Sequence, residues 1–293
     1  MISSDILKKI RRIEILCRKT STEIFAGEYH SAFKGRGMEF SEVREYHFGD
    51  DIRFVDWNVS SRMGRLFVKQ FVEERELTVI LAVDLSASLS FFSGRKSKME
   101  IAAELSAIVA FTAMLNHDKV GLLIFTDRIE RFIPPKKGRV HLLRIIREIL
   151  TFTPEGRGTA IDKGLVYLNK VLKKKAILFL VSDFIDRDFT TSLKVASQKH
   201  DLIAIRLIDP REKIPPRRGL FILKDSESGE EFFADFGDKR IRSGFEQIRR
   251  ERRAFLDDLF KKYGIDSITI DDEENTDQPL FDLFLKRKRK IRR

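Results

Sequence analysis

The feature that most constrains the fold is an uninterrupted apolar run, LTVILAV at residues 77–83, which ends at Asp84. A strand with water on one face alternates apolar and polar side chains, whereas a strand covered on both faces is apolar at every position. The segments 119–125 (KVGLLIF), 176–181 (AILFLV) and 202–208 (LIAIRLI) have the same character. The sequence therefore predicts a parallel sheet buried inside the protein.

Segments with helical periodicity separate these strands. Apolar residues recur every three or four positions over 98–115, and further helices are predicted at 139–151, 160–173, 189–199 and 241–263. Strands joined by helices of this length imply right-handed crossovers, which place helices on both faces of a mostly parallel sheet. We therefore expect an α/β fold.

Other segments give weaker signals. We expect a strand at 66–74, a short edge strand at 129–133 that Pro134 and Pro135 end, a hairpin at 219–236 and a last strand at 266–270. A helix is expected at 5–17. The predicted domains are an N-terminal helix and extension (1–76), an α/β domain (77–270) with the hairpin inserted near 219–236, and an acidic linker with a basic C-terminal tail (271–293).

The composition of the chain excludes several classes of protein and of binding site. The single cysteine, Cys17, excludes an intramolecular disulfide and a zinc site made of several thiolates. The chain has no uncharged apolar stretch of roughly 18 residues and no signal-peptide pattern at its start. These observations predict a protein without a membrane span, and we expect it in the cytoplasm.

The net charge of +11 is concentrated at the two ends of the chain. Seven basic residues lie in 286–293 and six in 8–19, so the remaining chain is nearly neutral. A basic groove across the fold is not indicated, and nucleic-acid binding is not the expected role. Nucleic-acid binding through the basic C-terminal tail is an alternative.

Three segments place oxygen-bearing side chains at the ends of predicted strands. Asp84, Ser86 and Ser88 follow the strongest strand, Thr159 precedes a helix after a Gly-rich loop, and Asp183 ends the strand at 176–181. In an open parallel sheet, ligands bind beyond the carboxyl ends of the strands. Two carboxylates and three hydroxyls favour Mg²⁺ or Mn²⁺ over zinc or copper.

Because hydroxyl ligands are neutral, such an ion would keep most of its positive charge and could bind an acidic group of a protein partner. A simpler interpretation is that Asp84 and the serines only cap the following helix. The additional Thr159 and Asp183, in the order expected along the chain, favour the metal site.

The sequence also resembles the bacterial family called domain of unknown function number fifty-eight, which is similar to von Willebrand factor A domains, a Rossmann-like fold. The resemblance covers nearly the whole chain and is most specific over 27–90. It is carried by the segments 27–31 (GEYHS), 33–37 (FKGRG), 39–40 (EF), 44–46 (REY), 49–51 (GDD), Arg53, 56–57 (DW) and 73–76 (EERE), followed by the Asp84-x-Ser86-x-Ser88 motif.

By this resemblance, the five candidate ligands take the positions of a metal ion-dependent adhesion site. The family is often encoded beside MoxR-type AAA+ ATPases. The resemblance therefore implies a non-enzymatic protein-binding module, an adaptor for such an ATPase in complex assembly or maturation.

A second polar cluster lies at 44–57, where charged residues surround a tryptophan. Its members are Arg44, Asp50, Asp51, Arg53, Asp56 and Trp57. We expect a loop that Arg–carboxylate pairs clamp onto the sheet, with Trp57 as its apolar plug. The alternatives are a partner surface, or a carboxylate base that would make the protein a Mg²⁺-dependent hydrolase.

Overall fold

The computed structural model describes residues 23–33, 38–73, 76–90, 93–186, 188–213, 216, 218–227, 229–271 and 275–291. The helix expected at 5–17 lies outside these residues. The chain forms two compact units, one of residues 1–32 and 78–293 and the other of residues 33–77. We call them the core unit and the hairpin unit.

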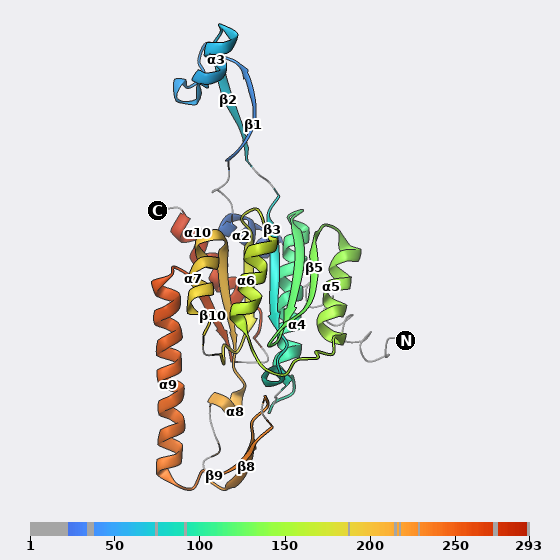
Figure 1. The fold of residues 1–293 in the computed structure, drawn as a ribbon, viewed down its shortest axis with the longest axis vertical. Helices are drawn as coiled ribbons and strands as arrows, with labels where there is room; N and C mark the ends of the chain where they lie inside the picture. The colour runs from blue at the N-terminus through green and yellow to red at the C-terminus, as the bar shows by residue number, and fades with distance from the viewer. Residues whose placement is uncertain are drawn as a thin grey trace. The chain divides into compact units, whose positions relative to one another are not determined.

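The core unit contains a six-stranded sheet in the order β10-β7-β6-β3-β4-β5 (Figure 1). Its strands are β3 (Thr78–Asp84), β4 (Lys119–Phe125), β5 (Ile129–Lys136), β6 (Ile177–Ser182), β7 (Asp201–Leu207) and β10 (Asp266–Ile270). All neighbours pair in parallel except β4 and β5, which are antiparallel. The mostly parallel sheet predicted from the apolar runs is confirmed.

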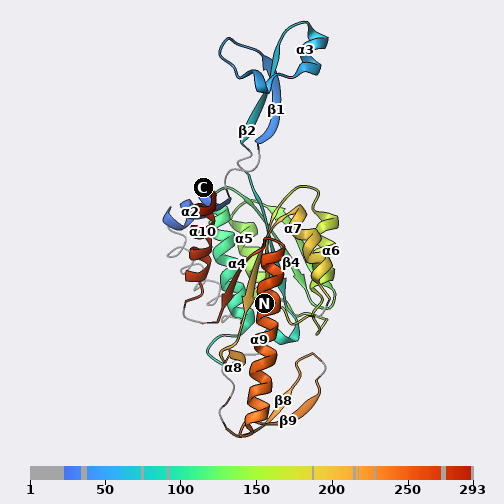
Figure 2. The ribbon, with the colours of Figure 1, turned by 90° about the vertical axis from the view of Figure 1, so that its left-hand side faces the viewer.

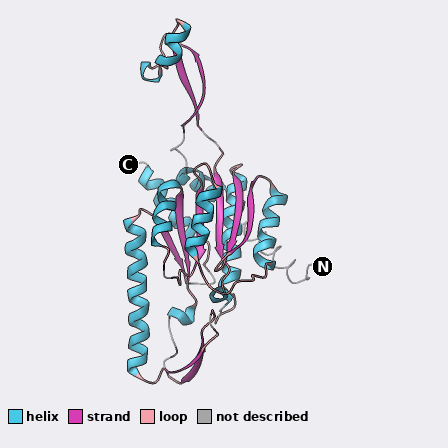
Figure 3. Ribbon diagram, viewed as in Figure 1, coloured by secondary structure: helices cyan, strands magenta, loops and turns pink. Residues whose placement is uncertain are grey.

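Helices cover both faces of this sheet (Figures 2 and 3). One face carries α2 (Glu23–Phe33), α4 (Lys98–Leu115), α5 (Arg139–Thr151) and α10 (Gln278–Ile291), and the other carries α6 (Ile161–Val171), α7 (Thr190–Lys199) and the C-terminal part of α9 (Lys239–Lys262). On the second face, Ile80 and Ala82 of β3 belong to one buried cluster with Leu165, Leu193 and Phe260. The apolar run of β3 is therefore buried because side chains on successive positions meet different helix layers.

Strand β5 extends further than the sequence predicted. It continues through Pro134 and Pro135 to Lys136, whereas we expected the prolines to end it at residue 133. β5 is an edge strand that pairs only with β4, and its register shifts between the pairs at Val120 and Leu122. Proline is tolerated there because an edge strand can leave backbone positions without a ladder hydrogen bond.

The two ends of the described chain belong to the core unit, which corrects the expected domain boundaries. Phe25 of α2 stacks on Phe281 of α10 at a ring-centroid distance of 5.6 Å, and the Tyr29 hydroxyl donates to Asp118 Oδ2 at 3.0 Å. Helix α2 thus belongs to the core unit, whereas the sequence grouped this part of the chain with the extension that follows it. The predicted basic tail is helical over 278–291, because Leu280, Leu283 and Phe284 form an apolar stripe that is buried in the fold.

Two antiparallel hairpins complete the structure. In the hairpin unit, β1 (Met38–Glu45) pairs with β2 (Phe67–Glu73), and the segment between them holds the 3₁₀ turn η1 (Ile52–Phe54) and α3 (Trp57–Met63). In the core unit, β8 (Leu220–Lys224) pairs with β9 (Glu231–Asp235) after the short helix α8 (Pro210–Lys213), which agrees with the hairpin expected at 219–236. Among the described helices, none combines the length and apolar character that crossing a membrane requires.

Candidate metal centre

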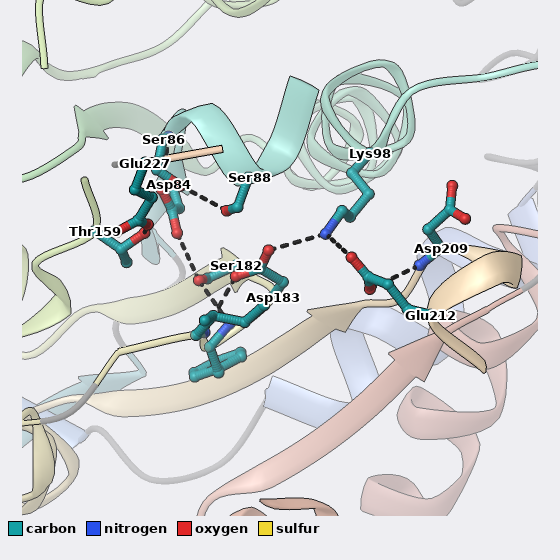
Figure 4. Close-up of polar contacts among 12 residues, drawn as sticks. Asp84, Ser86, Ser88, Lys98, Thr159, Ser182, Asp183, Asp209, Glu212 and Glu227 are labelled. Atoms are coloured by element: carbon teal, nitrogen blue, oxygen red, sulfur yellow. Dashed lines mark hydrogen bonds and ion pairs between the residues drawn. The ribbon is translucent and has the colours of Figure 1, made fainter. Parts of the chain in front are cut away.

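The candidate site lies at the carboxyl ends of β3 and β6, the neighbouring strands in the middle of the sheet (Figure 4). From β3 the chain continues to β4 on one side, and from β6 it continues to β7 on the other. Because the chain runs in opposite directions from these two strands, the loops at their carboxyl ends diverge. α/β proteins bind ligands between such loops. Asp84 is the last residue of β3, and Asp183 directly follows β6.

Asp84 is fully buried and held by two hydrogen bonds. Its Oδ2 accepts from the Ser182 hydroxyl at 2.7 Å, and its Oδ1 accepts from the backbone N–H of Ser86 at 2.8 Å. Burial, reinforced by repulsion from Asp183, raises the pKa of Asp84 to about 7, although both hydrogen bonds oppose this shift. The negative charge of Asp84 is therefore costly unless a cation binds beside it.

Ser86 and Ser88 come from the loop after β3, and Ser88 lies in the 3₁₀ turn η2 (Ala87–Ser90). Their hydroxyl oxygens are 3.0 Å apart, and both residues are buried. The backbone N–H of Ala87 donates to the carbonyl of Arg157 at 2.9 Å. The first loop is thus joined to the Gly-rich loop that carries Thr159.

The loop with Thr159 is fixed in place by contacts on both sides. A Cβ at Gly156 would lie 2.2 Å from Thr126 Oγ1, so only glycine fits there. The Gly156 N–H donates to Glu130 Oε1 at 2.8 Å, and the Ile161 N–H donates to Asp186 Oδ2 at 2.8 Å. The second contact joins the start of α6 to the loop that follows β6.

Asp183 is 3% exposed and makes two contacts through different oxygens. Its Oδ1 accepts from the Ile185 N–H at 3.1 Å, and its Oδ2 lies 2.9 Å from Lys98 Nζ. The next residue, Phe184, is buried and has a φ of 58°, a left-handed conformation that bulky side chains rarely adopt. Such strain is tolerated where the surrounding contacts determine the backbone, as they do at this turn.

The structure brings together all five residues that the sequence singled out. Figure 4 shows Asp84, Ser86, Ser88, Thr159 and Asp183 around one point above the sheet. No group of three or more His, Cys, Asp or Glu side chains in the described part of the chain is arranged to hold a metal ion. A cation at this point would therefore depend on the hydroxyls as well as the two carboxylates, and this all-oxygen donor set fits a hard divalent ion.

Three further residues of the site were missed by sequence reasoning. Lys98, only 2% exposed, bridges Asp183 and Glu212, with its Nζ 2.7 Å from Glu212 Oε1. Glu227 of the β8–β9 turn accepts a hydrogen bond from the Thr159 hydroxyl at 2.8 Å. Arg252 of α9 donates to the carbonyls of Phe184 and Asp186. These three residues belong to no local motif, so no pattern in the sequence marks them.

The cluster at 44–57 lies in the hairpin unit, and its charges pair locally. Arg44 donates to both oxygens of Asp50 at 2.8 and 2.7 Å, and this contact lowers the pKa of Asp50 to about 2. Arg53 pairs with Asp51 at 2.6 Å. The expected Arg–carboxylate pairs are present, but both join residues within 44–57, so the expectation that they clamp the loop onto the main sheet is wrong.

Two other residues of this cluster differ in their roles. The carboxylate of Asp56 caps α3, accepting from the N–H groups of Asn58 and Val59 at 3.0 and 3.2 Å. Trp57 is 65% exposed, so the expectation that it plugs an apolar core is wrong. The hairpin has only one sheet layer, and the ring has no second layer in its own unit to cover it.

Comparisons with known proteins agree with this fold. The profile of a family described as protein of unknown function DUF58 matches residues 42–255. Uncharacterized proteins of Mycobacterium bovis and Mycobacterium tuberculosis are each 28% identical over 250 residues, covering 84% of this chain and 78% of the relative.

Among solved structures, a conserved hypothetical protein, BatB from Bacteroides thetaiotaomicron, has a TM-score of 0.49, and an aerotolerance-related membrane protein from Bacteroides fragilis has a TM-score of 0.50. Each is 15% identical and covers 73% of this chain and 99% of its own. Proximal thread matrix protein 1 from the mussel byssus, with a zinc-occupied MIDAS motif, is 17% identical with a TM-score of 0.37, over 45% of this chain and 38% of that chain.

These comparisons correct one expectation and confirm two. The cytoplasmic assignment is wrong, because the fold is shared with an aerotolerance-related membrane protein. The apolar runs of a sequence show whether a segment of the chain could span a membrane. They carry no information on where in the cell the protein is located. The expected α/β fold, with a mostly parallel sheet and helices on both faces, is confirmed, and so is the family expected from the motifs at 27–90. The chain belongs to the DUF58 family of proteins of unknown function.

Proposed function

We propose that this protein is a divalent-cation-dependent protein-binding module without catalytic activity. Its cation would be Mg²⁺ or Mn²⁺, held by Asp84, Ser86, Ser88, Thr159 and Asp183. A carboxylate of a protein partner would complete the coordination, because hydroxyl ligands leave the ion with most of its charge. The partner class we propose is a MoxR-type AAA+ ATPase, for which the module would act as an adaptor in complex assembly or maturation.

One observation carries this proposal: oxygens from three distant loops meet at one point, where two buried carboxylates repel each other. Asp84 is fully buried, and its neighbour Asp183 raises its pKa. Lys98 compensates the charge of Asp183, whereas the hydrogen bonds that Asp84 accepts come from neutral groups. A buried carboxylate with neutral partners destabilises the fold unless a further positive charge compensates it. A bound divalent cation would supply that charge, whereas a capping role alone requires only one acceptor at the helix start.

Two sets of contacts make us prefer this proposal to the alternative functions. A hydrolase would require a free carboxylate base, but Asp50 and Asp51 are paired with arginines and Asp56 caps α3. Nucleic-acid binding through the C-terminal residues would require an accessible basic tail. Arg287, Lys288 and Lys290 are instead engaged in ion pairs within the core unit.

The test is calorimetric titration of the protein with MgCl₂ and MnCl₂. Wild-type protein should bind one cation, and Asp84→Ala should bind none while its circular dichroism spectrum stays unchanged. Asp188→Ala is the matched control, because this carboxylate follows the Asp183 loop but is exposed. Unchanged Mg²⁺ affinity in Asp84→Ala would end the proposal.

The partner is tested separately, by affinity capture from native extract. A MoxR-type ATPase should be retained in Mg²⁺, and it should be lost in EDTA and with Asp84→Ala. Retention that is indifferent to EDTA would contradict a cation-dependent contact.

A further inference from the structure

Strand β7 carries an arginine into the interior near its carboxyl end. Arg206 is 8% exposed, and its register partner on β6 is Ser182. Leu202 and Ala204, at alternate positions of the same strand, belong to the buried cluster that also contains Leu256 of α9. Because side chains alternate along a strand, Arg206 lies on this same face of the sheet, which α9 covers.

Arg252 of α9 reaches the same region. Its guanidinium donates to the carbonyls of Phe184 and Asp186, in the loop that begins directly after β6. Burial lowers the pKa of Arg206, and repulsion from Arg252 lowers it further, so the two charges lie close enough to interact. Two guanidinium groups, one from β7 and one from α9, thus lie beside one loop.

The Arg206 guanidinium is buried without a counter-ion. Within the described part of the chain, no hydrogen bond or ion pair involves this group. Its Nε is shielded from solvent and has no acceptor, and the same holds for Nε of Arg252. The terminal nitrogens of Arg206 are not shielded in this way, so an anion can approach the group from solvent.

The carboxylates near these arginines already have other partners. Asp183 lies 2.9 Å from Lys98 Nζ, and Asp257 of α9 pairs with the exposed Arg253 at 3.7 Å. A buried charge without a partner destabilises a fold, and a buried N–H without an acceptor adds to that cost. An anion between the two guanidinium groups would remove both penalties.

The chemistry of arginine selects the ligand. Through Nε and a terminal nitrogen, a guanidinium donates two parallel hydrogen bonds that match two oxygens of one carboxylate or phosphate. Nε is the donor that lacks an acceptor on both Arg206 and Arg252. Chloride cannot accept such a pair of bonds in the same geometry. Because Asp183 and Asp257 lie nearby, a singly charged carboxylate is repelled less than a doubly charged phosphate.

We infer that Arg206 and Arg252 form a binding site for an oxyanion group, either a carboxylate or a phosphate, with the carboxylate preferred. This site goes beyond the proposed cation centre and does not depend on it, since none of the five candidate ligands belongs to it. The Asp183 loop lies between the two sites, so an acidic group bound by the arginines would lie beside the centre that we propose for a protein partner.

The experiment is NMR of the arginine Nε–H groups in ¹⁵N-labelled protein, titrated with sodium acetate or sodium phosphate. Sodium chloride keeps the ionic strength constant, and EDTA is present throughout, so the result is independent of any cation. The signals of Arg206 and Arg252 are identified by their loss in Arg206→Lys and Arg252→Lys. In wild-type protein both signals should shift along one saturation curve with acetate, and chloride alone should not move them.

The variants test the geometry of the site. Arg206→Lys keeps the charge but loses the paired donors, so acetate should bind at least about tenfold more weakly, as measured at the Arg252 signal. Arg253→Lys is the matched control, because this exposed neighbour pairs with Asp257, and it should bind acetate as wild type does. Circular dichroism shows whether each variant is folded.

The two titrations also identify the source of the oxyanion. Tighter binding of acetate supports a carboxylate ligand, and tighter binding of phosphate supports a phosphorylated one. Wild-type signals that respond to neither anion, or that follow ionic strength alone, would overturn the inference without any variant. Equal acetate affinity in folded Arg206→Lys would overturn it as well, whereas failure of Mg²⁺ binding would affect only the proposed function.

Discussion

Lys98 places a fixed positive charge beside the candidate cation ligands. It is the first residue of α4, where the partial positive charge of the helix N-terminus disfavours a cation. Its position therefore depends on Asp183 and Glu212, which lie 2.9 and 2.7 Å from its Nζ. The ammonium compensates part of the buried acidic charge in the absence of a metal ion, and it competes with a metal ion for Asp183.

We predict that Lys98→Met binds Mn²⁺ about tenfold more tightly than wild type, a gain of about 1.4 kcal/mol. In EDTA the same variant should unfold at a lower temperature, because Asp183 loses its counter-charge. Calorimetry and thermal unfolding measure the two effects. Lys96→Met removes a neighbouring ion pair, with Glu104 at 2.7 Å, and should leave Mn²⁺ affinity unchanged. Weaker Mn²⁺ binding in Lys98→Met would contradict the competition.

His200 gives the core unit a pH-dependent stability. It is buried, its Nδ1 accepts from the Ala176 N–H at 3.2 Å, and burial, aided by repulsion from Lys199 and Lys175, lowers its pKa from 6.5 to about 4. The unfolded chain therefore binds a proton at a higher pH than the folded chain does. The stabilisation is complete above pH 6.5 and is lost as the pH falls toward 4.

We predict that this histidine alone lowers the free energy of unfolding by about 3 kcal/mol between pH 7 and pH 4. The measurement is urea unfolding at a series of pH values, for wild type and His200→Asn. The asparagine side chain oxygen can accept the Ala176 N–H but does not titrate, so the variant should lose less stability over this range. Parallel pH profiles for the two proteins would show that another group is responsible.

At the scale of elements, the segment between β1 and β2 exposes large apolar side chains. Phe48, Ile52, Trp57 and Met63 are 105%, 65%, 65% and 63% exposed, although each could have packed in a core. Trp57 is the only tryptophan in the chain. Its fluorescence therefore reports on this segment alone.

We predict that acrylamide quenches Trp57 fluorescence nearly as efficiently as that of a free tryptophan derivative. The exposed ring contributes little to the fold, so Trp57→Ser should change the free energy of unfolding by no more than about 0.5 kcal/mol. Thermal unfolding measures this change. If acrylamide quenches Trp57 poorly, or if Trp57→Ser loses much stability, the ring is buried in an apolar core as the sequence suggested.

Helix α10 connects the end of the chain to one edge of the main sheet. Arg287 is 8% exposed, and its guanidinium reaches Asp201 of β7 at 2.8 Å and Asp266 of β10 at 2.7 Å. Both carboxylates sit at the first positions of their strands. One side chain thus holds two parallel strands in register.

We predict that Arg287→Leu lowers the free energy of unfolding by roughly 2–3 kcal/mol, because two partly buried carboxylates lose their partner. Arg289→Leu, on an exposed position of the same helix, should change it by less than about 0.5 kcal/mol. Urea unfolding gives both values. Equal effects of the two substitutions would mean that general charge, and not this contact, stabilises the helix.

At the scale of the whole molecule, the core unit contains every residue of the candidate metal centre. The hairpin unit contributes none of the five oxygens, nor Lys98 or Glu227. We therefore expect cation binding to depend on the core unit alone.

We predict that replacing residues 34–75 by a flexible Gly/Ser linker leaves the core unit folded and able to bind Mn²⁺ with wild-type affinity. The core strands and helices keep their own apolar contacts in such a variant. Calorimetry and circular dichroism test this prediction. Loss of Mn²⁺ binding in a folded variant would show that the hairpin unit completes the site.

The sequence by itself determined the sheet, its helices and the five oxygens at the strand ends. Continuous apolar runs and helical periodicity are local properties, so β4, α4, α5 and β10 begin and end at the predicted residues. Carboxyl ends of parallel strands share one edge, and this rule alone brought Asp84 and Asp183 together.

Only the tertiary structure decided which charges surround that site. Lys98 meets Asp183 across 85 residues of sequence, Thr159 meets Glu227 across 68, and Arg287 meets Asp201 across 86. No local pattern marks these pairs, because each arises from the packing of elements that are distant in the chain. The exposure of Trp57 has the same origin, since burial depends on whether a second layer covers the hairpin.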